Sequence, residues 1–97
     1  MWIGALEMDL LLGDVHSLKE KRSVVRPIVA ELRRKFDVSA AEVGALDLHR
    51  RAAVGAGIVA ADRAYVVEVL DAVERLVSGR PEAQLLSARR RLFTAED

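Results

Sequence analysis

Apolar residues recur with two different periods in the first third of the chain. Between residues 2 and 12 (WIGALEMDLLL), every second position is apolar or glycine, while the intervening positions include Glu7 and Asp9. Because the side chains of a β-strand alternate between its two faces, this pattern predicts a strand with one buried face and one mixed face.

The stretch 17–36 (SLKEKRSVVRPIVAELRRKF) changes to the helical period. Ser17 stands three residues before Glu20, which is the spacing of a capping box at a helix start. Pro27 removes one N–H inside the helix, but the apolar phase continues beyond it, so we expect a kink in a continuing helix that ends near Asp37. The residues expected to face the core are Leu18, Val25, Ile28, Val29, Leu32 and Phe36.

Three further strands are expected from short apolar or alternating runs. They cover residues 38–46, 52–60 and 83–93, and the residues at 47–50 would form the hairpin connection between the first two. The run at 52–60 is apolar on both faces, which favours a central strand. Residues 94–97 are expected to form a flexible tail.

A second helix is expected over Arg63–Ser78. Asp62 is a good N-cap, and Gly79 ends the helical pattern with Pro81 just beyond it. Its expected core residues are Tyr65, Val66, Val69, Leu70, Val73, Leu76 and Val77.

The element order is therefore β-α-β-β-α-β in one domain over residues 1–97. Two right-handed crossovers would give an α+β, ferredoxin-like sandwich, with a four-stranded antiparallel sheet and two helices on one face. The last strand would lie antiparallel beside the first. Arg89 and Arg91 would then face Glu7 and Asp9 on the open face of the sheet.

Composition narrows the function classes. The chain has 15 Lys and Arg against 15 Asp and Glu, no Cys, and no apolar run long enough to span a membrane. We therefore expect a soluble cytoplasmic protein without disulfides or thiolate metal sites. His16 and His49 are isolated, so no metal site or cofactor is expected. No catalytic motif is found, and the absence of Asn argues against the Arg-plus-Asn site of acylphosphatase-like enzymes.

Several segments together resemble the bacterial YlxP-like family (domain of unknown function 503). They are Ser17–Arg22 (SLKEKR), Val24-Val25, 32–39 (LRRKFDVS), Ala41-Glu42-Val43, Asp47-Leu48, Arg51-Ala52 and Gly55. The resemblance implies a ferredoxin-like fold. It also implies genes beside those of translation initiation factor two and ribosome-binding factor A, and hence an association with RNA or the ribosome. His49 stands where relatives usually carry Trp, which puts a partner contact at that position in doubt.

The cations of the first helix are unevenly distributed. Lys19, Arg22, Arg26 and Arg33, called the basic stripe below, fall within about one quadrant of the helical wheel. Such a stripe can follow a phosphate backbone, although long cationic side chains also lie along the rim of an ordinary buried helix. The third strand carries no aromatic side chain, so base stacking on the open sheet is not expected.

The leading hypothesis is a non-enzymatic accessory protein that binds structured RNA or the ribosome. The candidate contact residues are Lys19, Lys21, Arg22, Arg26, Arg33, His49, Arg50 and Arg51. The alternative is an interaction or regulatory module that dimerises, or binds a partner protein, through the open face of the sheet. Its candidate surface is the flat, small-residue face of Ala53, Gly55, Gly57 and Val59. The Arg89–Arg91 cluster either pairs with Glu7 and Asp9 or extends a binding surface.

Overall fold

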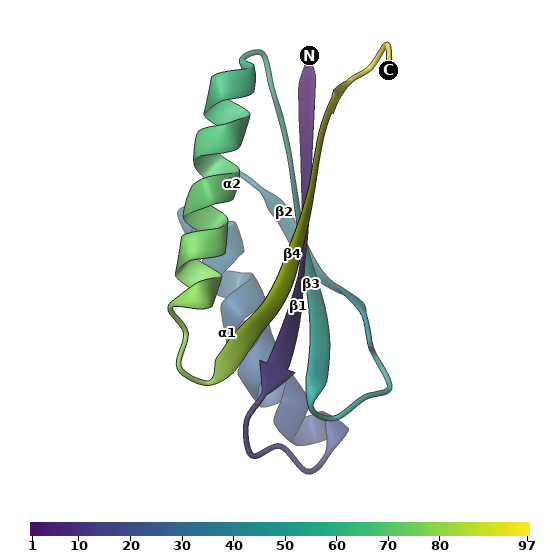
Figure 1. Cartoon of the computed structure of the whole chain (residues 1–97). Coiled ribbons are helices and arrows are strands. Elements are labelled where there is room, and N and C mark those ends of the chain that lie inside the picture. The colour runs from purple at the N-terminus through teal and green to yellow at the C-terminus, as the bar shows by residue number, and fades with distance from the viewer.

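Six elements follow one another in the order that the periodicities predict. The computed structural model describes all residues 1–97. The elements are β1 (Trp2–Leu12), α1 (Leu18–Lys35), β2 (Ser39–Gly44), β3 (Arg51–Ala60), α2 (Arg63–Ser78) and β4 (Ala83–Thr94), as Figure 1 shows. The last strand includes Thr94, which was expected in the tail, and a turn follows in which the Thr94 N–H donates to the Asp97 carboxylate at 2.7 Å.

The four strands form one antiparallel sheet in the order β2-β3-β1-β4. The first and third strands are therefore central, and for the third strand this is the position that its apolar character predicts. Both helices lie on the same side of this sheet, and the two chain termini lie at the same end of it (Figure 1). The ferredoxin-like α+β fold is confirmed.

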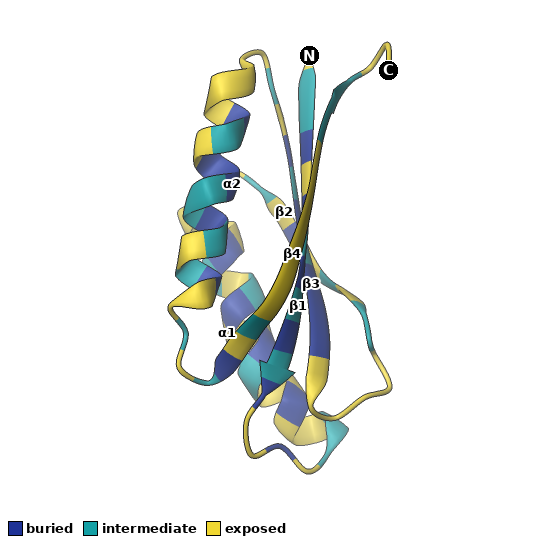
Figure 2. Ribbon diagram, viewed as in Figure 1, coloured by how far each residue is buried: buried dark blue, intermediate teal, exposed yellow.

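The core lies between the helices and one face of the sheet. Its buried residues come mainly from alternate positions of β1 and β3 and from one side of each helix, as the colouring of the ribbon in Figure 2 shows. Gly4 of β1 permits the close approach of α2, because a Cβ at this position would overlap Val66 Cγ1. Tyr65 was expected in the core but is 44% exposed. It lies at the margin of the apolar arc of α2, in the first turn.

The start of α1 is capped largely as the sequence predicts. Ser17 Oγ accepts a hydrogen bond from the Glu20 N–H at 3.1 Å. The Glu20 carboxylate in turn accepts from the His16 N–H at 3.2 Å, one residue before the cap. The helix continues past Pro27 to Lys35, and Phe36 is its C-cap, so the helix ends just before Asp37.

Two β-bulges shape the sheet. In β2 the extra residue is Val43, between Glu42 and Gly44, and its side chain lies over Gly55 of β3. A bulge re-aims a side chain, and here it places a valine above a bare glycine on the open face. The contact explains why Gly55 lacks a side chain, as a Cβ there would lie 3.0 Å from Val43 Cγ1. The second bulge is in the β1–β4 pairing next to Asp9.

Candidate nucleic-acid interface

The basic stripe is exposed along one flank of α1. Lys19, Arg22, Arg26 and Arg33 are all exposed, and none of them lies within ion-pair distance of a carboxylate. Arg33 Nε donates to the Ala40 carbonyl of β2 at 2.9 Å, so this flank lies toward the outer edge of β2. The stripe thus presents uncompensated positive charge beside an edge strand.

Lys21 does not belong to this surface, and its expected role in RNA contact is wrong. Its side chain is only 2% exposed, and Nζ lies 2.8 Å from Glu42 Oε2. Nζ also donates to the Ala45 carbonyl at 2.6 Å. A buried ammonium with two acceptors inside the protein is not available to a phosphate. The helical wheel held the signal, because Lys21 falls among Leu18, Val25 and Ile28 on the apolar arc.

The hairpin between β2 and β3 is tied to the start of α1. Besides the bond from Lys21 to Ala45, Arg50 Nε donates to the carbonyls of Leu12 and Gly13, at 3.3 and 2.9 Å. The hairpin therefore lies at the same end of the protein as the first turn of α1. Arg50 adds its charge at this end, and the neighbouring His49 is exposed.

Arg51 is separated from Arg50 by the alternation of β3. It pairs in register with Leu11, which places its side chain on the open face, and its charge contributes to lowering the pKa of Asp9. The sequence-predicted cations are thus divided between two surfaces. Lys19, Arg22, Arg26, Arg33 and Arg50 remain on the helix side, whereas Arg51 faces the open sheet.

The Arg89–Arg91 cluster is mainly structural, and its three residues have different partners. Arg89 pairs with Glu7 and Asp9 across β1, as expected from the register. A hydrogen bond from Ser87 and one from Arg89 hold the pKa of Asp9 below its ordinary value. Arg90 faces the other side and pairs with Asp71 and Glu74 of α2, at 2.8 and 3.2 Å.

Arg91 has neither Glu7 nor Asp9 as a partner, which corrects the expectation for this residue. Its guanidinium carbon lies 4.5 Å from the ring centroid of Phe93, in a cation–π contact. The register explains the difference, because Arg91 lies opposite Ala5, and Glu7 lies opposite Arg89. Arg91 is therefore a cation on the open face without a carboxylate partner.

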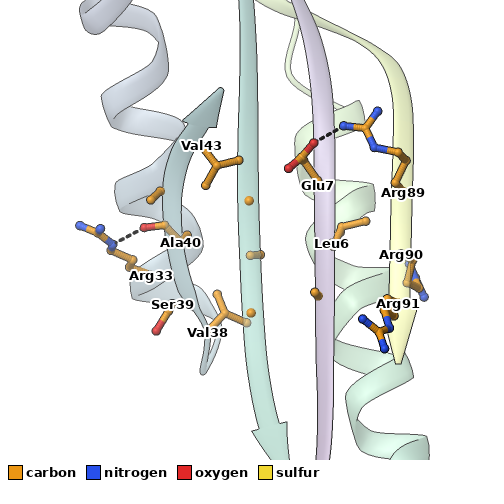
Figure 3. A pocket seen from close by; sticks show the side chains of 15 residues that line it. Leu6, Glu7, Arg33, Val38, Ser39, Ala40, Val43, Arg89, Arg90 and Arg91 are labelled. Carbon is orange, nitrogen blue, oxygen red and sulfur yellow. Dashed lines mark hydrogen bonds and ion pairs between the residues drawn. The ribbon is translucent and has the colours of Figure 1, made fainter. Parts of the chain in front are cut away.

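A groove of about 820 Å³ runs over the open face of the sheet. Its floor consists of glycine and alanine positions of the three strands β1, β2 and β3 (Figure 3). Val43 borders it on the β2 side, and Arg89 and Arg91 border it on the β4 side, while Arg33 lies beyond the outer edge of β2. The bulge that creates the Val43 wall leaves no signal in the sequence.

No group of three or more His, Cys, Asp or Glu side chains is arranged to hold a metal ion. Neither α1 nor α2 combines the length and the apolar character that crossing a membrane requires.

Comparison with known proteins places the chain in a family. The family model described as "Protein of unknown function (DUF503)" matches residues 3–90. "Uncharacterized protein YlxP" of Bacillus subtilis (strain 168) is 32% identical over 91 residues, which cover 94% of this chain and 99% of the relative. The resemblance found in the sequence is thereby confirmed over nearly the whole chain. The chain belongs to the DUF503 family and is a relative of YlxP.

Proposed function

We propose that the protein is a non-enzymatic accessory protein that binds structured RNA, with ribosomal RNA as the leading candidate. The observation that carries the proposal is the basic stripe on α1, where four exposed cations have no carboxylate partner. Six of the other eleven Lys and Arg residues form ion pairs with carboxylates, namely Lys21, Arg34, Lys35, Arg80, Arg89 and Arg90.

The spacing of the stripe suits a phosphate backbone. Lys19, Arg22 and Arg26 are three and four residues apart, which corresponds to about 4.5 and 6 Å along the helix axis. Arginine offers two parallel N–H donors to a phosphate, and Arg50 adds a further cation at the same end of the protein. Recognition through phosphates and shape needs no stacking aromatics, and the sheet carries none on β3.

The open face supports the alternative, a module that dimerises through its sheet, less well. Arg51, Arg89 and Arg91 lie on this face, with Arg33 at its edge, against the two carboxylates Glu7 and Asp9. Two copies packed face to face would bring net positive surfaces together, which opposes association.

The test is capture of RNA from a bacterial lysate at about 100 mM salt, where phosphate contacts still contribute strongly. The test variant is Arg22→Glu/Arg26→Glu, two exposed positions without ion-pair partners. The matched control is Arg63→Glu/Arg75→Glu, which makes the same change in net charge on exposed positions of α2. Lys21 is left unchanged, because replacing a buried charge would test folding instead of binding.

Parent and control are expected to retain ribosomal RNA that nuclease removes, and the test variant is expected to lose it while its circular dichroism stays unchanged. Equal recovery of RNA with the test and control variants would contradict the proposal. So would the absence of RNA from the parent sample.

A further inference from the structure

The groove on the open face contains a row of four residues that spans the whole sheet. The registers of the three strand pairs align Ser39 of β2, Gly57 of β3, Ala5 of β1 and Arg91 of β4. Three strand spacings separate the two ends of the row, or about 14 Å. A hydroxyl therefore stands at one end and a guanidinium at the other, with almost no side chain between them.

The middle of the row is open space above the backbone. A Cβ added at Gly57 would have as its nearest neighbour the Gly4 carbonyl oxygen, at 3.8 Å. Val43, set by its bulge, borders the floor on one side. The groove volume of about 820 Å³ lies in the range of pockets that bind small organic molecules.

The charges at the β4 wall differ along its length. Arg89 is neutralised by Glu7 and Asp9, whereas Arg91 has no carboxylate partner and is held over Phe93. The cation–π contact favours this position of the Arg91 side chain before any ligand arrives, which lowers the entropy cost of binding. The free positive charge thus lies at the Ala5 level of the groove, next to its bare floor (Figure 3).

We propose that this groove binds a small organic anion with a flat apolar body. The ring system would lie on Gly57 and Ala5, its carboxylate, sulfonate or phosphate would pair with Arg91, and Ser39 would bond a polar group at the far end. Of the basic stripe only Arg33 borders the groove, at the outer edge of β2, and Lys19, Arg22 and Arg26 do not line it, so the site can be tested apart from RNA binding.

The experiment uses two probes that differ by one charged group. Anilinonaphthalene sulfonate is an anion with a flat naphthalene ring, and N-phenylnaphthylamine has the same rings without the sulfonate. Binding is followed by fluorescence, and the bound position is mapped by the amide shifts of isotope-labelled protein. The variants are Arg91→Gln, which removes the charge, and Gly57→Leu, which fills the floor. Arg26→Gln removes one exposed cation elsewhere and is the control.

The sulfonate is expected to bind at least tenfold more tightly than the uncharged probe, as a charge-assisted contact allows. Arg91→Gln should remove this preference, Gly57→Leu should abolish binding of both probes, and Arg26→Gln should change neither. The shifted amides should be those of Ala5, Gly55 and Gly57. Equal binding of both probes to the parent, or shifts confined to α1 or the hairpin, would overturn the proposal. A parent of twice the chain mass that Gly57→Leu returns to one chain would also overturn it and assign this face to a second copy.

Discussion

The Lys21 ammonium and the Glu42 carboxylate form an ion pair at 2.8 Å across the interface of α1 and β2. Lys21 is the only charged residue among the buried ones, and Glu42 is 21% exposed. Because Lys21 also donates to Ala45, one side chain connects the helix, the edge strand and the hairpin. The pair fixes the position of the hairpin relative to the basic stripe.

Removing one partner of this pair should destabilise the protein strongly. Glu42→Gln leaves the Lys21 charge buried, and we expect it to lower the free energy of unfolding by about 3 kcal/mol or more. The double variant Lys21→Met/Glu42→Gln should recover much of this loss, because no unpaired charge remains. Urea unfolding of Lys21→Met, Glu42→Gln and the double variant measures the coupling free energy between the two side chains. A loss below about 1 kcal/mol for Glu42→Gln would show that the pair is not effectively buried.

Replacing Ala45 with glycine should stabilise the protein. It is the one non-glycine residue with positive φ, at 56°, and this conformation is unfavourable for a side chain with a Cβ. Glycine removes that strain but adds freedom to the unfolded chain, so Ala45→Gly should stabilise the protein by up to about 1 kcal/mol. Ala45→Val should destabilise it, since a β-branched residue fits this region worst. Thermal unfolding of the parent and both variants measures the order of their stabilities. An Ala45→Val variant more stable than the parent would contradict the prediction.

Two glycines on opposite faces of the sheet should respond differently to a methyl group. At Gly4 the added Cβ would overlap Val66 Cγ1 and lie 3.0 Å from Leu70 Cδ1, so α2 must shift. We expect Gly4→Ala to cost about 1–3 kcal/mol through overpacking. Gly57→Ala should change the free energy of unfolding by less than about 0.5 kcal/mol, because its surroundings are open. Denaturant unfolding of Gly4→Ala and Gly57→Ala measures the two free energies of unfolding. Equal losses of stability would contradict the prediction and place Gly57 in a packed environment.

Most of the fold was predictable, because local signals and long-range packing agree. The period of two in β1, the Ser17 and Asp62 caps, and Gly79 at the end of α2 each mark an element that the structure contains. The expected pairing of Arg89 with Glu7 and Asp9 is confirmed, because the topology places β4 antiparallel beside β1 and the alternation of β4 directs Arg89 to the open face.

The candidate site was less predictable than the fold, because the positions of its side chains depend on tertiary contacts. Lys21 was assigned to the surface by residue type, although its position on the wheel lies among core residues and a partner on β2 satisfies it. The partner of Arg91 is Phe93 on the same strand, and side-chain choices of this kind depend on exact register. Val43 becomes a groove wall through a bulge, and no periodicity marks an extra residue in a strand.

The stability should depend on pH through Glu31. A hydrogen bond from Arg80, together with the charges of Arg80 and Lys35, holds the pKa of Glu31 below its ordinary value of 4.5. A carboxylate with a lowered pKa in the folded state stabilises fully above its unfolded pKa, and this contribution is lost as pH falls through the folded value. Glu31→Gln should therefore be less stable than the parent at neutral pH, with a difference that shrinks below about pH 4.

Urea midpoints at neutral and acidic pH measure this difference. Glu68→Gln is the control, as Glu68 is an exposed carboxylate of α2 without an ion pair. A difference between Glu31→Gln and the parent that stays constant or grows on acidification would contradict the assignment.

The salt dependence of affinity for purified ribosomal RNA tests the central claim most directly. Each phosphate contact contributes about 0.7–0.9 to the magnitude of the slope of log affinity against log salt, so the four cations of the basic stripe and Arg50 predict a slope of roughly −3.5 to −4.5. Arg26→Gln should reduce the magnitude of the slope by about one, and Arg75→Gln on α2 should leave it unchanged. A slope near zero, or equal slopes for the parent and Arg26→Gln, would contradict RNA binding by the basic stripe.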